Sequence, residues 1–141
     1  MSGRTVRSVS TFSGVITEYE IPHPNFALDH QPEGITVGSD GNLWFTEQAR
    51  VARITPTGAI SEFTLPIEED TLLYAIAGLP DGILWFTDQG GGKVDKITTS
   101  GAITEYKVTP KYKWLGGIVL GPDGHVWFTA AGLNQVMKIG R

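Results

Sequence analysis

The chain has 141 residues, with 18 glycines, 8 prolines, 4 tryptophans, no cysteine and a formal net charge of −4. The lack of cysteine excludes disulfide bridges and thiolate metal sites, and the acidic charge disfavours nucleic acids, whose phosphates bind basic surfaces. No apolar stretch approaches the roughly 20 residues of a membrane helix, and residues 1–14 lack the apolar segment of a signal peptide, so we expect a cytoplasmic protein.

The N-terminal segment, residues 1–13, is expected to contain one strand over residues 6–10. A second strand is predicted over residues 14–22, where β-branched and aromatic residues dominate and Pro22 ends the run. The pattern that opens this strand, glycine followed by two apolar residues, two polar residues and an aromatic residue, returns at residues 58–63 and 101–106. Residues 14–22 are therefore one copy of a repeated element.

The chief feature after residue 33 is a repeat of about 41 residues. Trp44, Trp85 and Trp127 are 41 and 42 residues apart, and each stands in a Trp-Phe-Thr triplet preceded by an Asp-Gly pair. Asp-Gly between two apolar runs predicts a β-hairpin, because glycine takes a positive φ at no steric cost. A period of about 40–45 residues with four strands is typical of a β-propeller.

We therefore predict an all-β fold of about three propeller blades, each a sheet of four antiparallel strands, over residues 14–141. The blades are expected at residues 33–66, 73–109 and 116–139; the last has only three strands, and residues 14–22 can close it as the fourth. Propellers usually have about four to eight blades, so three blades form an open arc. The chain is then either a fragment of a larger propeller or one half of a homodimer that completes a ring.

The repeat resembles one known family. The string from Glu33 to Glu47, the Ile-Thr-Glu-Tyr of the fourth strands and the C-terminal Lys138–Arg141 are similar to blades of the streptogramin (virginiamycin B) lyase family. The resemblance extends from Gly14 to the end of the chain. It implies a seven-bladed ring that opens cyclic streptogramin B antibiotics, and so confers antibiotic resistance, by eliminating across an ester C–O bond. It further implies that Mg²⁺ assists and that a histidine acts as acid or base.

The chain departs from the family pattern at the catalytic histidine. In the family this histidine follows a proline at the start of a first strand, where the three repeats here hold Glu33, Tyr74 and Gly116. The family's catalytic glutamate lies just beyond Trp-Phe at the end of a second strand, where the repeats hold Glu47, Asp88 and Ala130. Whether the chain is a carbon–oxygen lyase therefore stays open, and we expect the isolated chain to be inactive. The alternative is a non-catalytic propeller module that binds a ligand or assembles with itself.

Several residues are candidates for a site at the rim where first strands start and second strands end. Glu33 and Glu47 are predicted to face each other there. They are the candidate ligands of a metal site, since carboxylate oxygens suit Mg²⁺ or Ca²⁺; the favoured alternative is that both are solvated carboxylates without a metal. Glu47 and His30 are the candidates for a catalytic role, His30 lying with His23 in the long connection before the first blade. Trp114, Tyr74 and Asp88 are the candidates for binding a small molecule or cyclic peptide, since exposed aromatic rings stack on such ligands.

Overall fold

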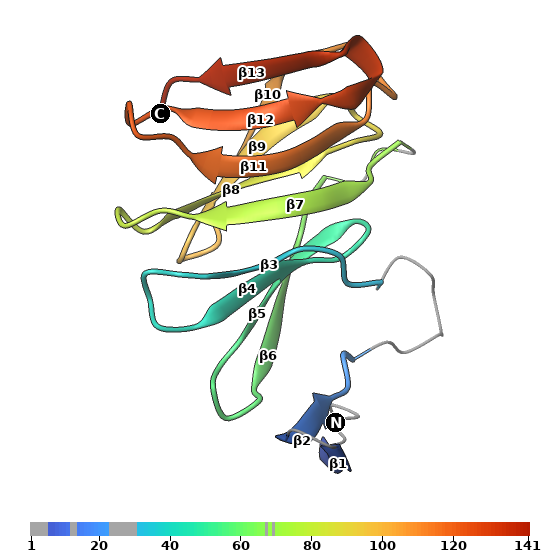
Figure 1. Cartoon of the computed structure of the whole chain (residues 1–141), viewed down its shortest axis with the longest axis vertical. Helices are drawn as coiled ribbons and strands as arrows, with labels where there is room; N and C mark the ends of the chain where they lie inside the picture. The colour runs from blue at the N-terminus through green and yellow to red at the C-terminus, as the bar shows by residue number, and fades with distance from the viewer. Residues whose placement is uncertain (1–5, 12–13, 23–30, 67, 69) are drawn as a thin grey trace.

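The structure is a computed structural model that describes residues 6–11, 14–22, 31–66, 68 and 70–141. Its strands form three stacked sheets and a separate hairpin, and the N- and C-terminal ends of the chain lie at opposite ends of this arc (Figure 1). The described residues contain one short 3-10 turn, η2 (Ala131–Leu133), and no helix with the length and apolar character needed to cross a membrane.

Three sheets correspond to the three predicted blades. The first blade contains β3 (Ile35–Val37), β4 (Leu43–Thr46), β5 (Arg50–Ile54) and β6 (Ile60–Thr64). The second contains β7 (Leu73–Gly78), β8 (Ile83–Asp88), β9 (Lys93–Thr98) and β10 (Ile103–Lys107). The third contains β11 (Leu115–Leu120), β12 (Val126–Ala130) and β13 (Gln135–Ile139). Every pairing within these sheets is antiparallel and joins strands that are consecutive in the sequence, which confirms the predicted fold.

The hairpin turns have the backbone conformation that the Asp-Gly pairs predict. Gly41, Gly82 and Gly124 have φ values of 80°, 84° and 80°. A residue with a Cβ rarely adopts this left-handed conformation, so glycine is required at these three turns. The three repeats therefore share the same connection between their first and second strands.

Each blade has two different faces, which explains why both residues of the Trp-Phe pair are apolar. Successive side chains of a strand point to opposite sides, so we name the two sides of a blade the Trp face and the Phe face. Trp44 of the first blade and Phe86 of the second belong to one buried cluster, whereas Trp85 of the second blade and Phe128 of the third belong to another. In both interfaces the Trp face of one blade covers the Phe face of the next.

The threonine of the same motif joins neighbouring blades by a hydrogen bond. The Thr46 hydroxyl donates to the Tyr74 carbonyl at 2.6 Å and accepts from a backbone amide of its own blade at 3.0 Å. The Thr87 hydroxyl likewise donates to the Gly116 carbonyl at 2.9 Å and accepts from an amide of its own blade at 3.1 Å. Both threonines are fully buried, so these hydroxyls bond backbone groups of two neighbouring blades inside the interface.

Thr87→Val should lower the free energy of unfolding by about 1–3 kcal/mol, because the methyl group leaves the partly buried Ala75 amide and Gly116 carbonyl without a partner. Urea denaturation followed by far-ultraviolet circular dichroism measures this loss. The control is Thr104→Val, at an exposed position on the outer strand of the same blade, which should change the free energy by less than about 0.5 kcal/mol. Equal effects of the two variants would contradict the blade-joining role of Thr87.

The N-terminal strands form a two-stranded sheet of their own. β1 (Val6–Thr11) corresponds to the strand expected over residues 6–10, and β2 (Gly14–Tyr19) lies within the predicted range 14–22. The two pair with each other, and β11, β12 and β13 remain a three-stranded sheet, so residues 14–22 do not close the last blade within the single chain. The physical reason is that β1 is adjacent in sequence and costs little loop-closure entropy, whereas β13 lies at the other end of the arc (Figure 1).

Candidate functional site

The starts of the first strands and the ends of the second strands share one rim, as antiparallel pairing predicts. The Glu33 amide donates to the Thr46 carbonyl at 2.9 Å, and in the second blade Leu73 is the register partner of Asp88. We call this edge the candidate rim. It carries the residues at the two family positions of all three repeats: Glu33 and Glu47, Tyr74 and Asp88, and Gly116 and Ala130.

The carboxylates of the first blade do not form the solvated pair that the sequence predicted. Glu33 is exposed, but Glu47 is fully buried at the turn after β4, where its amide donates to the Arg50 carbonyl at 2.8 Å. Among the described residues, no group of three or more histidine, aspartate or glutamate side chains is placed to hold a metal ion. The buried Glu47 and the exposed Glu33 are therefore not the pair of solvated carboxylates that was expected to face a metal ion.

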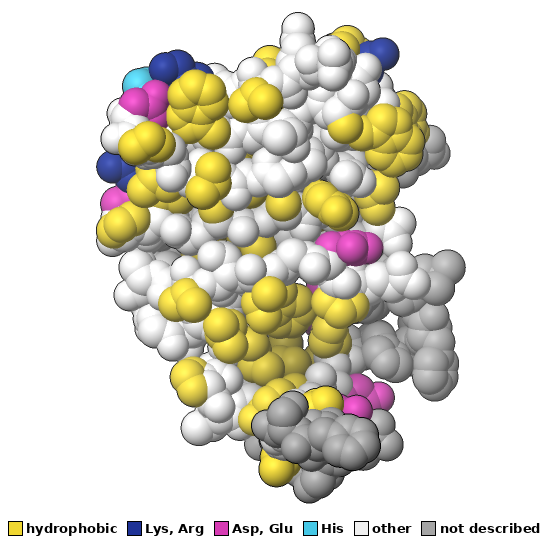
Figure 2. Space-filling view, in the orientation of Figure 1, with side chains coloured by type: hydrophobic (Ala, Val, Ile, Leu, Met, Phe, Trp, Pro, Cys, Tyr) yellow, Lys and Arg dark blue, Asp and Glu magenta, His cyan; other side chains and the backbone are white. Residues whose placement is uncertain are grey.

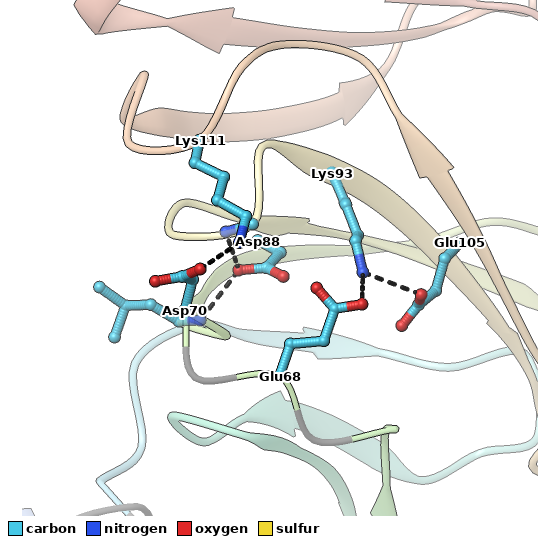
Figure 3. A network of polar contacts seen from close by, with 8 residues as sticks. Glu68, Asp70, Asp88, Lys93, Glu105 and Lys111 are labelled. Atoms are coloured by element: carbon cyan, nitrogen blue, oxygen red, sulfur yellow. Dashed lines mark hydrogen bonds and ion pairs between the residues drawn. The ribbon is translucent and has the colours of Figure 1, made fainter.

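Asp88 fastens the connection between the first two blades (Figure 3). One carboxyl oxygen accepts hydrogen bonds from the Leu72 amide at 2.9 Å and the Gly91 amide at 3.0 Å. A Cβ on Gly91 would lie 2.4 Å from the other oxygen, so glycine is required for this close approach. Burial raises the pKa of Asp88, although the two amides oppose the shift. The side chain that we predicted as a ligand contact is thus buried and holds a loop.

Next to Asp88, Lys93 bridges two acids, Glu68 from the connection between β6 and β7 and Glu105 from β10 (Figure 3). Its Nζ donates to Glu68 and to Glu105, at 3.0 Å in each case. Burial alone lowers the pKa of Lys93, but the hydrogen bonds and charges of the two glutamates raise it well above its ordinary value. Lys93 is therefore a cation that ties the segment before β7 to the outer strand β10.

Asp95 is the most isolated acid of the second blade. Its exposed fraction is 0%, and neither carboxyl oxygen has a hydrogen-bond partner among the described residues. Burial raises the pKa of Asp95 to about 8, and the negative charges of Glu105 and Asp88 add to the shift. Asp95 is therefore protonated over the lower part of the physiological pH range.

Exposed aromatic rings mark the rim at the second and third blades. The exposed fractions are 42% for Tyr74, 54% for Tyr112 and 52% for Trp114. Tyr112 and Trp114 have φ values of 58° and 53°, a left-handed conformation that is uncommon outside glycine. Such outliers persist only where the surroundings impose them, and they concentrate at functional sites.

Hydrogen bonds at both ends hold this aromatic loop in place. At one end Lys111 and the Tyr112 hydroxyl both donate to the carboxylate of Asp70. At the other end the Ala131 amide donates to the Trp114 carbonyl at 3.1 Å. The loop therefore presents the Trp114 indole, half exposed, from a fixed backbone.

Sequence reasoning found some of these residues and missed others. Tyr74 and Trp114 lie exposed at the candidate rim, whereas His23 and His30 lie outside the described residues. The roles of Asp70, Lys93 and Asp95 were not predicted. One signal was available for Asp95: the register partners of the repeat phenylalanines are Ala52, Asp95 and Met137, so an acid replaces an apolar residue in one repeat.

Known proteins resemble this chain over nearly its whole length. The model of the virginiamycin B lyase family matches residues 3–141. A virginiamycin B lyase of Nocardia farcinica (strain IFM 10152) is 37% identical over 116 residues, which cover 78% of this chain and 38% of that protein. The family model thus includes all three blades and extends to the last residue.

Solved structures give the same relationship. A catalytically inactive virginiamycin B lyase from Staphylococcus aureus, crystallised with quinupristin, has a TM-score of 0.80 and 35% identity, covering 92% of this chain and 43% of that one. A streptogramin B lyase structure has a TM-score of 0.76 and 34% identity, covering 94% and 43%. The chain thus spans between 38% and 43% of the length of these relatives.

Proposed function

Because this chain belongs to the virginiamycin B lyase family, we propose that it is a ligand-binding arc of a lyase-type propeller that does not open the ligand's ring by itself. The observation that carries the proposal is the candidate rim. Trp114 and Tyr74 present exposed aromatic rings there, while the position of the family histidine holds Glu33, Tyr74 and Gly116. The rim is equipped to bind and lacks the residue that the family uses as acid or base.

The proposed ligand is a cyclic depsipeptide with aromatic side groups, of the streptogramin B type. Aromatic rings on the protein offer large apolar contact area and favourable stacking geometry to such a macrocycle. The hydrogen bonds of the Trp114 carbonyl and of Tyr112 fix the loop before binding, so little conformational entropy is lost when a ligand docks. The Staphylococcus aureus relative crystallised with quinupristin supports this ligand class.

The absence of catalysis follows from the chemistry of elimination. Breaking a C–O bond in this way requires a base to remove a proton from the neighbouring carbon, and such a base works best with a pKa near the operating pH. At the position of the family histidine the three repeats hold Glu33, Tyr74 and Gly116, so none of them supplies an imidazole there. We assign no step to a metal.

Trp114→Ala is expected to weaken the binding of quinupristin at least about tenfold, which corresponds to about 1.4 kcal/mol of lost stacking. Isothermal titration calorimetry with the purified chain measures the dissociation constant without relying on tryptophan fluorescence. The matched control is Trp127→Ala, because Trp127 belongs to the blade repeat rather than to the rim loop; it should leave the dissociation constant within about twofold. No detectable binding by the parent chain, or equal losses in both variants, would contradict the proposed site.

A further inference from the structure

The two ends of the arc expose opposite blade faces. The third blade ends the arc with its Trp face, where Val119 and Val136 have exposed fractions of 59% and 67%. The first blade begins the arc with its Phe face, where Ile35 and Val37 have exposed fractions of 65% and 67%. Valine and isoleucine side chains exposed to this extent in adjoining strands form apolar patches of the kind that mark interaction surfaces.

A groove lies along the Phe face of the first blade. It has a volume of about 380 Å³ and runs between Tyr19 and Ile21 on one side and Ile35, Phe45 and Ile60 on the other. Figure 2 shows the hydrophobic side chains gathered in the hollow between the first blade and the N-terminal hairpin. Within the chain, the preceding blade packs on the Phe faces of the second and third blades. The groove has the same kind of apolar lining, but no blade of the chain packs on it.

The polar groups at the two ends also match. Thr46 and Thr87 donate to the carbonyls of Tyr74 and Gly116, which begin the first strands of the following blades. Thr129 stands at the same position in the third blade and is exposed. The corresponding carbonyl acceptor, that of Glu33, lies at the start of the first blade. One end of the arc thus carries the donor, and the other end the acceptor, of the bond that joins blades within it.

The N-terminal hairpin already stands where an outer strand of a preceding blade belongs. The Phe63 ring of β6 contacts Gly101 of the next blade so closely that a Cβ there would lie 2.9 Å from it. The Tyr19 ring of β2 contacts Gly58 of the first blade in the same way, with a corresponding distance of 2.3 Å. β2 is therefore placed as a fourth strand, and the third blade is the sheet that has only three strands.

We propose that the third blade of one copy packs on the first blade of a second copy, with β13 taking the place of β1 beside β2. The Trp face around Trp127 then covers Ile35, Val37 and Phe45 of the partner, as the Trp faces of the first two blades cover their neighbours. The same contact made in both directions closes two chains into a ring of six blades, three from each, which is within the usual range of about four to eight. A second copy fits because it brings both a three-stranded blade for β2 and a further β2 for the third blade.

Light scattering coupled to size-exclusion chromatography tests the assembly with the full chain. The expected mass is twice the 15.3 kDa of one chain. This mass should stay the same when the protein is diluted from about 100 to about 5 µM, because dimers with interfaces of standard size persist at these concentrations. Val136→Asp on the exposed Trp face and Ile35→Asp on the exposed Phe face should each give the single-chain mass with an unchanged circular dichroism spectrum. The control Ala102→Asp, at an exposed position at the outer edge of the second blade, should leave the two-chain mass unchanged.

Mixing the two disrupted variants makes the test specific for head-to-tail pairing. Val136→Asp keeps an intact Phe face and Ile35→Asp keeps an intact Trp face, so their mixture should recover the two-chain mass although neither variant does so alone. A single-chain mass for the parent would overturn the proposal, and so would a dimer that survives either substitution, because it would use another surface. Species longer than two chains would also overturn it, since open head-to-tail chains do not close into the proposed ring.

Discussion

Trp85→Ala is expected to destabilise the chain by about 3–5 kcal/mol, because it removes the largest side chain of a buried interface and leaves a cavity there. Trp85 is almost completely buried in the cluster between the second and third blades and stacks on Tyr106 with ring centroids 5.7 Å apart. Folded domains are stable by only about 5–15 kcal/mol, so this loss is a large fraction of the total. Calorimetry should show a melting temperature lower by about 10–20 °C.

The control for Trp85 is the same residue at the end of the arc. Trp127→Ala changes the same repeat position, but no blade of the chain covers the Trp face of the third blade. The single chain should therefore lose only about 1 kcal/mol, while its pairing with a second copy is weakened. Equal losses of melting temperature for the two variants would show that blade stacking is not what makes Trp85 important.

Asp95→Ala should stabilise the chain by a few kcal/mol at pH 8–9, because it removes a buried carboxylate whose charge destabilises the folded chain. A difference of one in pKa between the folded and the unfolded chain corresponds to about 1.4 kcal/mol. Burial raises the pKa of Asp95 from 3.8 to about 8. Between these two values the folded chain keeps a proton that the unfolded chain releases, so the stability of the parent falls as the pH rises through this window. Alanine is the residue that the first blade carries at this position, Ala52.

Melting temperatures at pH 4.5, 6, 8 and 9 measure this effect. The parent should lose stability across the series, and the gap between Asp95→Ala and the parent should widen with pH. Glu105, Asp88 and Lys93 face the same site, and their charges move the midpoint without reversing the sign. Asp81→Ala, which removes an exposed carboxylate, is the control: the lost turn contact with the Ile83 amide lowers the melting temperature equally at every pH, and the dependence on pH should be unchanged. An Asp95→Ala variant less stable than the parent at pH 8 would contradict the assignment.

The fold could be predicted because short patterns in the sequence determine its strands and turns. The Asp-Gly pairs fix hairpin turns, and the Trp-Phe pairs require two covered faces, so the strands and their antiparallel order follow from short stretches of sequence. The partner of β2 could not be predicted in this way. Its pattern matches the outer strands β6 and β10, but the nearest edge in sequence, β1, takes it in the single chain.

The site was predicted less completely, because burial and long-range contacts decide it. The position of Glu47 at the end of a second strand predicts a residue at the rim, but not how far the neighbouring residues cover its side chain, so its burial was missed. Asp70 and Lys111 lie in connections 41 residues apart and meet only after the second blade has formed. Asp88 follows the Trp-Phe-Thr triplet at the end of a second strand, which placed it among the predicted ligand contacts. In the structure its carboxylate instead accepts hydrogen bonds from two backbone amides.

The most direct test of the proposed function is whether the purified chain opens a streptogramin B ring. Quinupristin is incubated with the chain and Mg²⁺, and cyclic and linear forms are separated by liquid chromatography with mass detection. Elimination leaves the mass unchanged whereas hydrolysis adds one water, so the two reactions are distinguished. We expect the cyclic compound to bind and to be recovered intact. A linear product of unchanged mass, whose formation stops when EDTA is added, would contradict the proposed function.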